Sequence, residues 1–383
     1  MTPKFDVLST SALELRDRLQ NGTLISVDVV SEYLAQIRKH TKLNLVISLR
    51  EHDRLLADAN QRDEERQAGK VRSPFHGLSF LAKDASAAPR LSPQITIGSF
   101  ALKESKPPAN AVAIDALLEA GMTLVGKSNV TEFCGCKCRE CRMVRRRRLG
   151  LITLGQRRFQ ERRPSSRFNA PGGSSTGSAH AAAAGFVPLP IGTETCGSLI
   201  TPVGRAGVYT LKLTPGTAST EGVGKITAEW DTIGVSAKSV EEIAILNDLL
   251  LMTKEPEAVG WTIEADAKEA DPNFPGEIKS HLEWTMKSIK EAGGRIVNTE
   301  VKICANQYIA SLESPDVKSL GGIVEFNKAN AHIELPPENP GQDGLVAAAE
   351  NTDRGRPSVP AQSLLHQDLE WAVKDGTEYE PEE

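Results

Sequence analysis

The sequence predicts an α/β fold in which a mixed or parallel sheet is covered by helices. Two observations support this prediction. Short apolar segments of strand length alternate along the chain with longer segments of helical periodicity. Hydrophobic residues make up 39% of the 383 residues, which is enough for a sizeable core. The length suits one large domain or two ordinary ones, and we expect one domain over residues 1–345.

The first third of the chain alternates helix and strand. Leu13, Leu15 and Leu19 recur near helical spacing and predict a helix over 9–20. A second helix follows, for which Ser26 is the expected N-cap. The next expected elements are a short strand at 43–49, a charged helix at 51–68, a buried strand at 78–84, a helix at 111–120 and a strand at 122–125.

The rest of the chain is regular except for one segment and the end. A Gly/Ser loop and an Ala-rich helix are followed by short strands up to about residue 213. Residues 346–383 are rich in proline and then acidic, and we expect them to form a tail or the shortened end of the domain. Further expected elements are helices at 239–252 and 277–291 and a strand at 295–301.

Composition excludes several classes of protein. The net charge of −5 gives no global basic field and disfavours nucleic acid as a partner. No apolar run approaches the ~18 residues of a membrane span. The first residues carry no apolar signal segment, and six cysteines make no disulfide scaffold, so a cytoplasmic location is expected. No cofactor is implied.

Residues 134–167 interrupt the regular pattern. They hold eleven arginines and one lysine against two glutamates, a local charge of +10. Cys134, Cys136, Cys138 and Cys141 lack the second distant pair that makes a zinc signal specific, so no metal site is assigned. The arginines are typical of a solvated run or of a nucleic-acid patch. The abrupt composition would also suit a shifted reading frame or a retained intron.

Two Gly/Ser loops, residues 171–178 and 192–198, are the strongest chemical signal. Their glycines let consecutive N–H groups face one point, where a phosphate or an oxyanion could bind. The first loop is no P-loop, because Ser178 stands where that motif has lysine. It fits the G-x-S-x-G nucleophile pattern, but an irregular run and Pro171 precede it in place of a strand.

Lys83 offers a third interpretation, because it ends an apolar strand. A buried lysine loses solvation, which lowers its pKa and lets the neutral amine act as a base. Such an amine could accept a proton from a serine that relays it from a second serine. The residues alone leave these interpretations open.

The order of motifs resembles the amidase signature family. The family is known for a mixed twisted β-sheet covered by helices and for hydrolysis of carbon–nitrogen amide bonds. The resemblance covers residues 10–133 and 169–345. It rests on the segments His76–Asp84, Gly126–Phe133, Gly172–Ser178, Gly192–Ser198 with Gly207–Pro215, Trp230–Gly234 and Glu325–Asn327.

The resemblance implies a Ser-Ser-Lys triad. Ser198 matches the nucleophile, Ser174 matches the relay serine that the family holds on a cis peptide, and Lys83 matches the terminal base. The backbone N–H groups of Thr195, Cys196, Gly197 and Ser198 would form the oxyanion hole. An acyl-enzyme would form and water would release it. Ser175 and Glu194 are expected to support the substrate or these catalytic groups.

Three departures from the family pattern accompany the resemblance. Cys196 stands where the family has glycine, Ile200 stands where many members have arginine, and the chain stops soon after the last motif. The main expectation is an amidase for a small-molecule amide. A glutamine-hydrolysing subunit of a tRNA-dependent amidotransferase, which would need a tRNA-binding partner, and a truncated inactive paralogue are the alternatives. Whether the chain forms a homodimer is left open.

Overall fold

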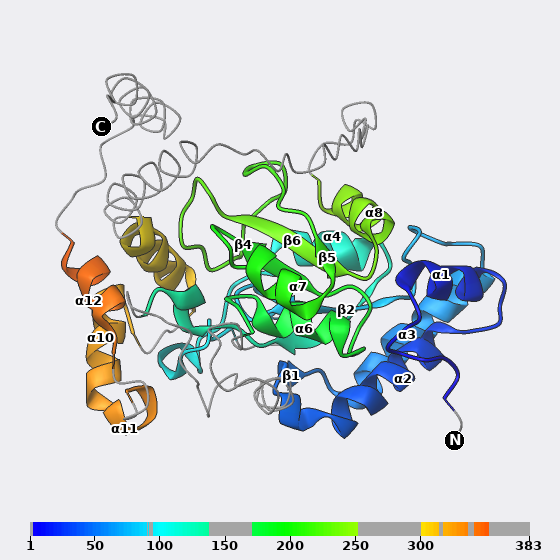
Figure 1. The fold of residues 1–383 in the computed structure, drawn as a ribbon, viewed down its shortest axis with the longest axis horizontal. Helices are drawn as coiled ribbons and strands as arrows, with labels where there is room; N and C mark the ends of the chain where they lie inside the picture. Colours follow the sequence, from blue (N-terminus) through cyan, green and yellow to red (C-terminus); the bar gives the residue numbers. More distant parts are fainter. Residues whose placement is uncertain are drawn as a thin grey trace, which may run out of the picture.

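A mixed sheet of six strands forms the centre of the part of the chain that the structure describes (Figure 1). β2 runs parallel to both of its neighbours, and each of the other pairings is antiparallel. This computed structural model therefore confirms the expected α/β class with a mixed sheet. The strand order is β1 (Val46–Leu49), β3 (Thr123–Ser128), β2 (Ser79–Lys83), β4 (Ile191–Glu194), β6 (Thr232–Ala237) and β5 (Tyr209–Thr210).

Several expected segments lie outside the described residues. These are the helix at 277–291, the arginine-rich segment beyond Lys137 and the tail beyond Asn351. Within the described ranges, no helix is both long and apolar enough to cross a membrane. The structure describes residues 3–89, 91, 95–137, 171–251, 300–313, 317–335 and 341–351.

Alternation along β2 directs side chains to two cores on opposite faces of the sheet. Phe80 and Ala82 enter one cluster together with residues of α1 (Ala12–Gln20), α4 (Val112–Glu119) and α8 (Val240–Leu250). Leu81 enters a second cluster with residues of α2 (Ser26–Lys39), α3 (His52–Gln67) and α6 (Thr176–Ala183). Because successive strand residues point to opposite faces, one buried strand contributes to both cores.

A third cluster lies beyond the end of β2, between the central sheet and the C-terminal helices. Figure 1 shows these helices together on one side of the molecule, far from the N-terminal helices. They are a helical segment at 300–311, α10 (Leu320–Ala329), α11 (Ala331–Glu334) and α12 (Asp343–Glu350).

Three sequence predictions can be compared with the structure of the C-terminal helices and of the first residue of α2. The strand expected at 295–301 is wrong at Glu300 and Val301, which are helical and whose side chains join a helix-lined core. The boundary expected at residue 345 falls inside α12, where Ala348 is buried. Ser26 does not cap α2. It is the first helical residue, and the Asp63 carboxylate accepts its N–H at 2.6 Å instead.

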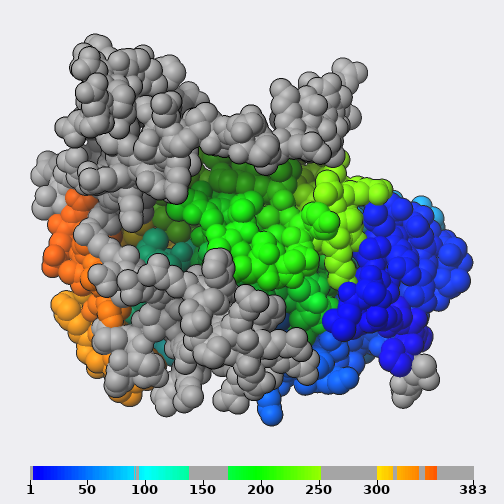
Figure 2. Space-filling model, in the orientation of Figure 1, coloured from blue at the N-terminus to red at the C-terminus, as the bar shows by residue number. Residues whose placement is uncertain are grey.

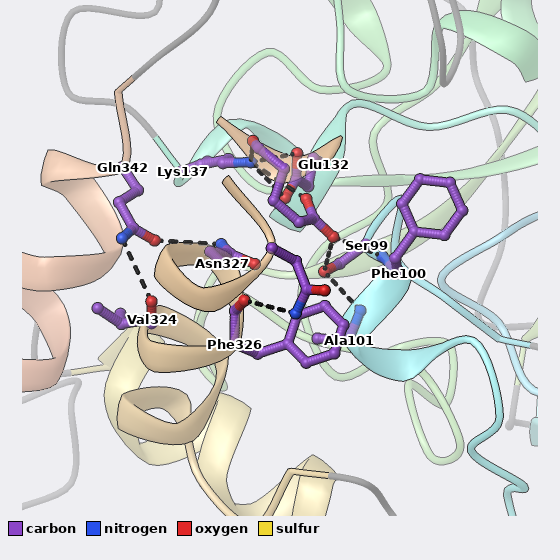
Figure 3. A network of polar contacts seen from close by, with 11 residues as sticks. Ser99, Phe100, Ala101, Glu132, Lys137, Val324, Phe326, Asn327 and Gln342 are labelled. Atoms are coloured by element: carbon purple, nitrogen blue, oxygen red, sulfur yellow. Dashed lines mark hydrogen bonds and ion pairs between the residues drawn. The ribbon is translucent and has the colours of Figure 1, made fainter. Parts of the chain in front are cut away.

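A buried ionic network ties the start of the 134–167 segment to the C-terminal helices (Figure 3). Lys137 donates to both carboxylate oxygens of Glu132, at 2.8 and 2.9 Å. It also donates to the backbone carbonyl of Glu334 at 2.5 Å and lies 3.3 Å from the Glu334 carboxylate. The other oxygen of that carboxylate accepts the N–H of Phe100 at 2.8 Å. Residues 134–137 are therefore part of the folded protein.

We expect Lys137→Met to lower the free energy of unfolding by about 3–5 kcal/mol, because two buried carboxylates would lose their cation. Urea denaturation of the full chain would measure this. The control is Lys103→Met at an exposed lysine, which should change stability by no more than about 0.5 kcal/mol. A loss at Lys137 as small as that of the control would contradict a structural role for the network.

Candidate active site

Lys83 ends β2 with its side chain completely buried. Its Nζ donates to Ser174 Oγ at 2.8 Å and to Thr193 Oγ1 at 2.7 Å. Burial lowers the pKa of Lys83 below its ordinary value, while the neighbouring Cys134, Asp231 and Glu194 act in the opposite direction. A buried amine with a lowered pKa next to a hydroxyl is suited to accept a proton.

The loop before α6 presents Ser174 to this lysine. The peptide bond between Gly173 and Ser174 is cis, as the resemblance implied, and the Ser174 carbonyl accepts the N–H of Thr131 at 3.1 Å. Gly172 has a φ of +78°, and a Cβ on it would lie 2.9 Å from Pro202 Cα. Glycine is therefore needed where this loop passes the next helix, α7 (Ile200–Ala206).

Thr193 is a partner of Lys83 that the sequence analysis missed. It lies in β4 next to Glu194, and only the pairing of β2 with β4 brings its hydroxyl to the amine. The only feature of the sequence that pointed to Thr193 was its position within the second Gly/Ser loop, residues 192–198. Because this hydroxyl accepts a hydrogen bond from the amine, it stabilises the charged form of Lys83.

We expect Thr193→Val to lower kcat/KM roughly tenfold, because a hydrogen bond to a charged group contributes about 1.5 kcal/mol or more. The same change should move the acid limb of the pH–rate profile to lower pH, since it destabilises the ammonium form. Thr193→Ser keeps a hydroxyl and should restore both quantities towards wild type. Equal profiles for the two variants would rule out this role.

Glu194 organises the loop that carries Ser198. Its carboxylate accepts the N–H groups of four consecutive residues, including Ser198 at 3.0 Å and Ile200 at 2.9 Å. Two of these N–H groups, those of Leu199 and Ile200, are unpaired donors at the N-cap and first residue of α7. Glu194 therefore fixes the path of the backbone on both sides of Ser198.

The four expected oxyanion donors fall into two pairs. The N–H groups of Gly197 and Ser198 donate to Glu194. Among the backbone hydrogen bonds of turns, loops and caps in the described residues, none has the N–H of Thr195 or Cys196 as its donor. Thr195 and Cys196 are therefore the two expected donors whose N–H groups do not bond to Glu194.

Ser198 itself is half-buried at the surface of this loop. Its hydroxyl makes no hydrogen bond to Ser174 or to Lys83 in the described structure, so the relay from Ser198 is not closed here. The two loops are nevertheless joined, because the Ser175 N–H donates to the Ser198 carbonyl at 2.8 Å. The Ser175 hydroxyl donates to the Thr193 carbonyl at 2.9 Å, so Ser175 holds the Ser198 loop against β4.

Cys196 is exposed beside Ser198, but burial of its sulfur and the Glu194 charge raise the pKa of its thiol. A raised pKa keeps the thiol protonated, which is unfavourable for a nucleophile. Asp231 is a second residue that the sequence analysis did not assign. It accepts the Thr195 hydroxyl at 2.6 Å and the Ile226 N–H at 2.7 Å, and burial raises its pKa.

No group of three or more His, Cys, Asp or Glu side chains in the described ranges could hold a metal ion. Cys134, which is buried, and Cys136, which is half-buried, lie within those ranges, and the other two cysteines of the expected cluster lie outside them. Ile200 is 46% exposed next to the Ser198 loop. Figure 2 shows part of the segment 171–251, in green, at the surface between the N-terminal helices, in blue, and the C-terminal helices, in orange.

A buried lysine bonded to a serine on a cis peptide, beside a second serine on a glycine loop, defines a class of amide-hydrolysing enzymes. Residues 28–278 match the Amidase family. The chain therefore belongs to this family.

Curated relatives share sequence with this chain, and solved structures share its fold. An amidase homologue of Schizosaccharomyces pombe is 26% identical over 88% of this chain and 67% of its own length. A glutamyl-tRNA(Gln) amidotransferase subunit from Leptospira interrogans is 31% identical over 77% of this chain and 61% of its own length. The peptide amidase of Stenotrophomonas maltophilia has a similar fold, with a TM-score of 0.73 and 24% identity over 96% of this chain and 78% of its own. The chain thus spans about two thirds of the length of these two curated relatives.

Proposed function

We propose that this protein hydrolyses a carbon–nitrogen amide bond through Ser198, Ser174 and Lys83. The observation that carries the proposal is the buried amine of Lys83 at 2.8 Å from the Ser174 hydroxyl. Family membership supports the reaction type. The substrate is a small-molecule amide, because the family and the peptide amidase fold both fit this chemistry.

The proposed reaction has two stages. Ser198 Oγ attacks the amide carbonyl carbon while its proton passes to Ser174 Oγ, whose own proton passes to the neutral Lys83 amine. The proton then returns along the same path to the leaving nitrogen as the C–N bond breaks, and an ester to Ser198 remains. Water hydrolyses this ester with the same proton path, which releases the acid and restores the three groups.

The reaction requires a hydrogen bond between the Ser198 and Ser174 hydroxyls. Ser198 lies on a loop held by Glu194 and Ser175, so a rotation of its side chain is the motion we propose to bring it to Ser174. Catalytic hydrogen bonds that are open without substrate commonly form in its presence. The developing oxyanion would accept from the free N–H groups of Thr195 and Cys196.

The pH dependence of kcat/KM on a simple primary amide tests the proposed base. Protonated Lys83 cannot accept a proton, so the rate should rise with pH through one ionisation and then level off. Burial lowers the pKa of Lys83, so the midpoint should lie below the ordinary lysine value of 10.5. A rate that falls with rising pH, or that stays flat from acid to neutral pH, would contradict a lysine base.

A second candidate function is glutamine hydrolysis for a tRNA-dependent amidotransferase. The similarity to the Leptospira amidotransferase chain favours it. Release of ammonia from free glutamine, strongly increased by a tRNA-binding partner that copurifies with the chain, would support this candidate. Faster hydrolysis of simple amides than of glutamine by the isolated chain would support the main proposal. A folded chain that hydrolyses neither would support the inactive paralogue.

A further inference from the structure

A narrow apolar cavity lies next to the proposed catalytic groups and has no role in the chemistry above. Its walls include Ile97, Phe133, Ile226 and Tyr308, which come from four separate segments of the third core cluster. The cavity has a volume of about 30 Å³. A water molecule needs roughly 10–15 Å³ on this measure, so the cavity has room for about two or three groups of water size.

Hydrogen bonds join the walls of this cavity to three parts of the proposed site. Ile97 donates to the carbonyl of Asp84, the residue after Lys83, at 3.1 Å. Phe133, which donates to the Ile97 carbonyl at 2.9 Å, lies two residues after the Thr131 that bonds Ser174. On a third side, the Asp231 carboxylate accepts hydrogen bonds from the Ile226 N–H and from the Thr195 hydroxyl of the Ser198 loop. The walls of the cavity are therefore hydrogen-bonded to the segments that carry the proposed catalytic groups.

The walls are held in an uncommon backbone conformation. Ile97, Phe133 and Cys134 all have positive φ values, of 46°, 46° and 53°. Such values are rare for residues other than glycine, above all for a β-branched side chain, and they concentrate at ligand-binding sites. Three residues with such φ values lie around one cavity. The surrounding fold therefore holds its walls in backbone conformations that are locally unfavourable.

Tyr308 is a wall residue of this cavity that carries a polar group. Its hydroxyl is buried and finds no hydrogen-bond partner among the described residues. Burial, together with the Asp84 charge, raises the pKa of the phenol well above its ordinary value, so the hydroxyl keeps its proton and can donate. A buried donor without a partner is unfavourable, and a ligand atom that accepts from it removes that penalty.

We propose that this cavity receives the acyl group of the substrate and that the Tyr308 hydroxyl donates to an acceptor atom on that group. The inference rests on the proposed amide hydrolysis and names its substrate class. The chain should prefer amides of short acyl groups that carry a hydrogen-bond acceptor. Long acyl chains exceed the cavity, and short apolar ones leave the hydroxyl unpaired.

Three amides test the proposal on the full chain. Butanamide and methoxyacetamide have the same number of heavy atoms and differ by an ether oxygen in place of one methylene, and decanamide is the long competitor. We expect kcat/KM for methoxyacetamide to exceed that for butanamide roughly three- to tenfold, the range of one neutral hydrogen bond. Decanamide should be at least about 100-fold poorer. Tyr308→Phe should bring the ratio of the two short amides to about one.

A matched pair of variants tests the volume. Ala305 lines the cavity, and Ala310 lies exposed on the same helical segment. Ala305→Leu should lower kcat/KM for butanamide relative to acetamide at least tenfold, whereas Ala310→Leu should leave that ratio unchanged. A preference for decanamide, or a ratio that Tyr308→Phe does not alter, would overturn the inference while leaving amide hydrolysis intact.

Binding separates the inference from the proposed function. Ser198→Ala should bind methoxyacetamide in a calorimetric titration, and the added Ala305→Leu change should remove that binding. If binding depends on Ala305 in this way but the wild-type chain hydrolyses no amide, the cavity is a binding site and the proposed hydrolysis is wrong. Equal binding with and without the leucine would overturn the cavity assignment.

Discussion

Replacing Ser198 by alanine should lower kcat for amide hydrolysis by roughly 10³-fold or more. The variant loses the oxygen that forms the acyl-enzyme, and knockouts of the nucleophile in comparable serine enzymes cost up to about 10⁶-fold. The loop should keep its shape, because its bonds to Glu194 and Ser175 use backbone atoms of residue 198. Single-turnover and steady-state rates on a primary amide would measure the effect.

The control for this variant is Ser31→Ala. Ser31 is exposed on α2, and its hydroxyl donates only within its own helix among the described contacts, to Val27 at 2.7 Å. Its removal should leave kcat unchanged. A Ser198→Ala enzyme that keeps more than a tenth of wild-type turnover would exclude this serine as the nucleophile.

Replacing Lys83 by methionine should reduce kcat to a similar degree. Methionine fills most of the space of the buried lysine stem, but it cannot accept the proton that Ser174 passes on. Because the three residues act as a unit, the double variant Lys83→Met/Ser174→Ala should lose little more activity than either single variant. Kinetics of the three variants, each checked by thermal unfolding, would give this comparison.

Additive losses in the double variant would show that Lys83 and Ser174 act independently, which is incompatible with a relay. Lys103→Met, at an exposed lysine outside the site, is the control and should retain full turnover. A folded Lys83→Met enzyme with an unchanged pH profile would exclude the lysine as the base.

Local pattern was sufficient to predict several elements around the site, but the short strands expected up to about residue 213 were wrong at Ile200–Ala206, which form the helix α7. The apolar run before Lys83 became the fully buried β2, and Ser239 caps α8 through a capping box with Glu242. Periodicity and caps depend on neighbours in the chain, so they can be recognised from the sequence. The strand expected at 295–301 was wrong at its end because burial by distant helices decided the local conformation.

The less predictable parts of the site depend on contacts between segments far apart in the chain. Thr193 reaches Lys83 across 110 residues and Lys137 reaches Glu334 across 197, so neither spacing gives a local signal. Glu194 could be placed beside the Ser198 loop, but its bonds to four N–H groups follow only from the turn into α7. The same turn decides which of the expected oxyanion donors remain free.

Labelling with a fluorophosphonate, followed by intact-mass and peptide mapping, tests the central proposal most directly. This reagent reacts with an activated serine nucleophile and leaves one stable adduct. We expect a single adduct on the full chain, located on the peptide that contains Ser198 and absent from Ser198→Ala. An adduct on another residue, or equal labelling of the alanine variant, would contradict the assignment of Ser198 as the nucleophile.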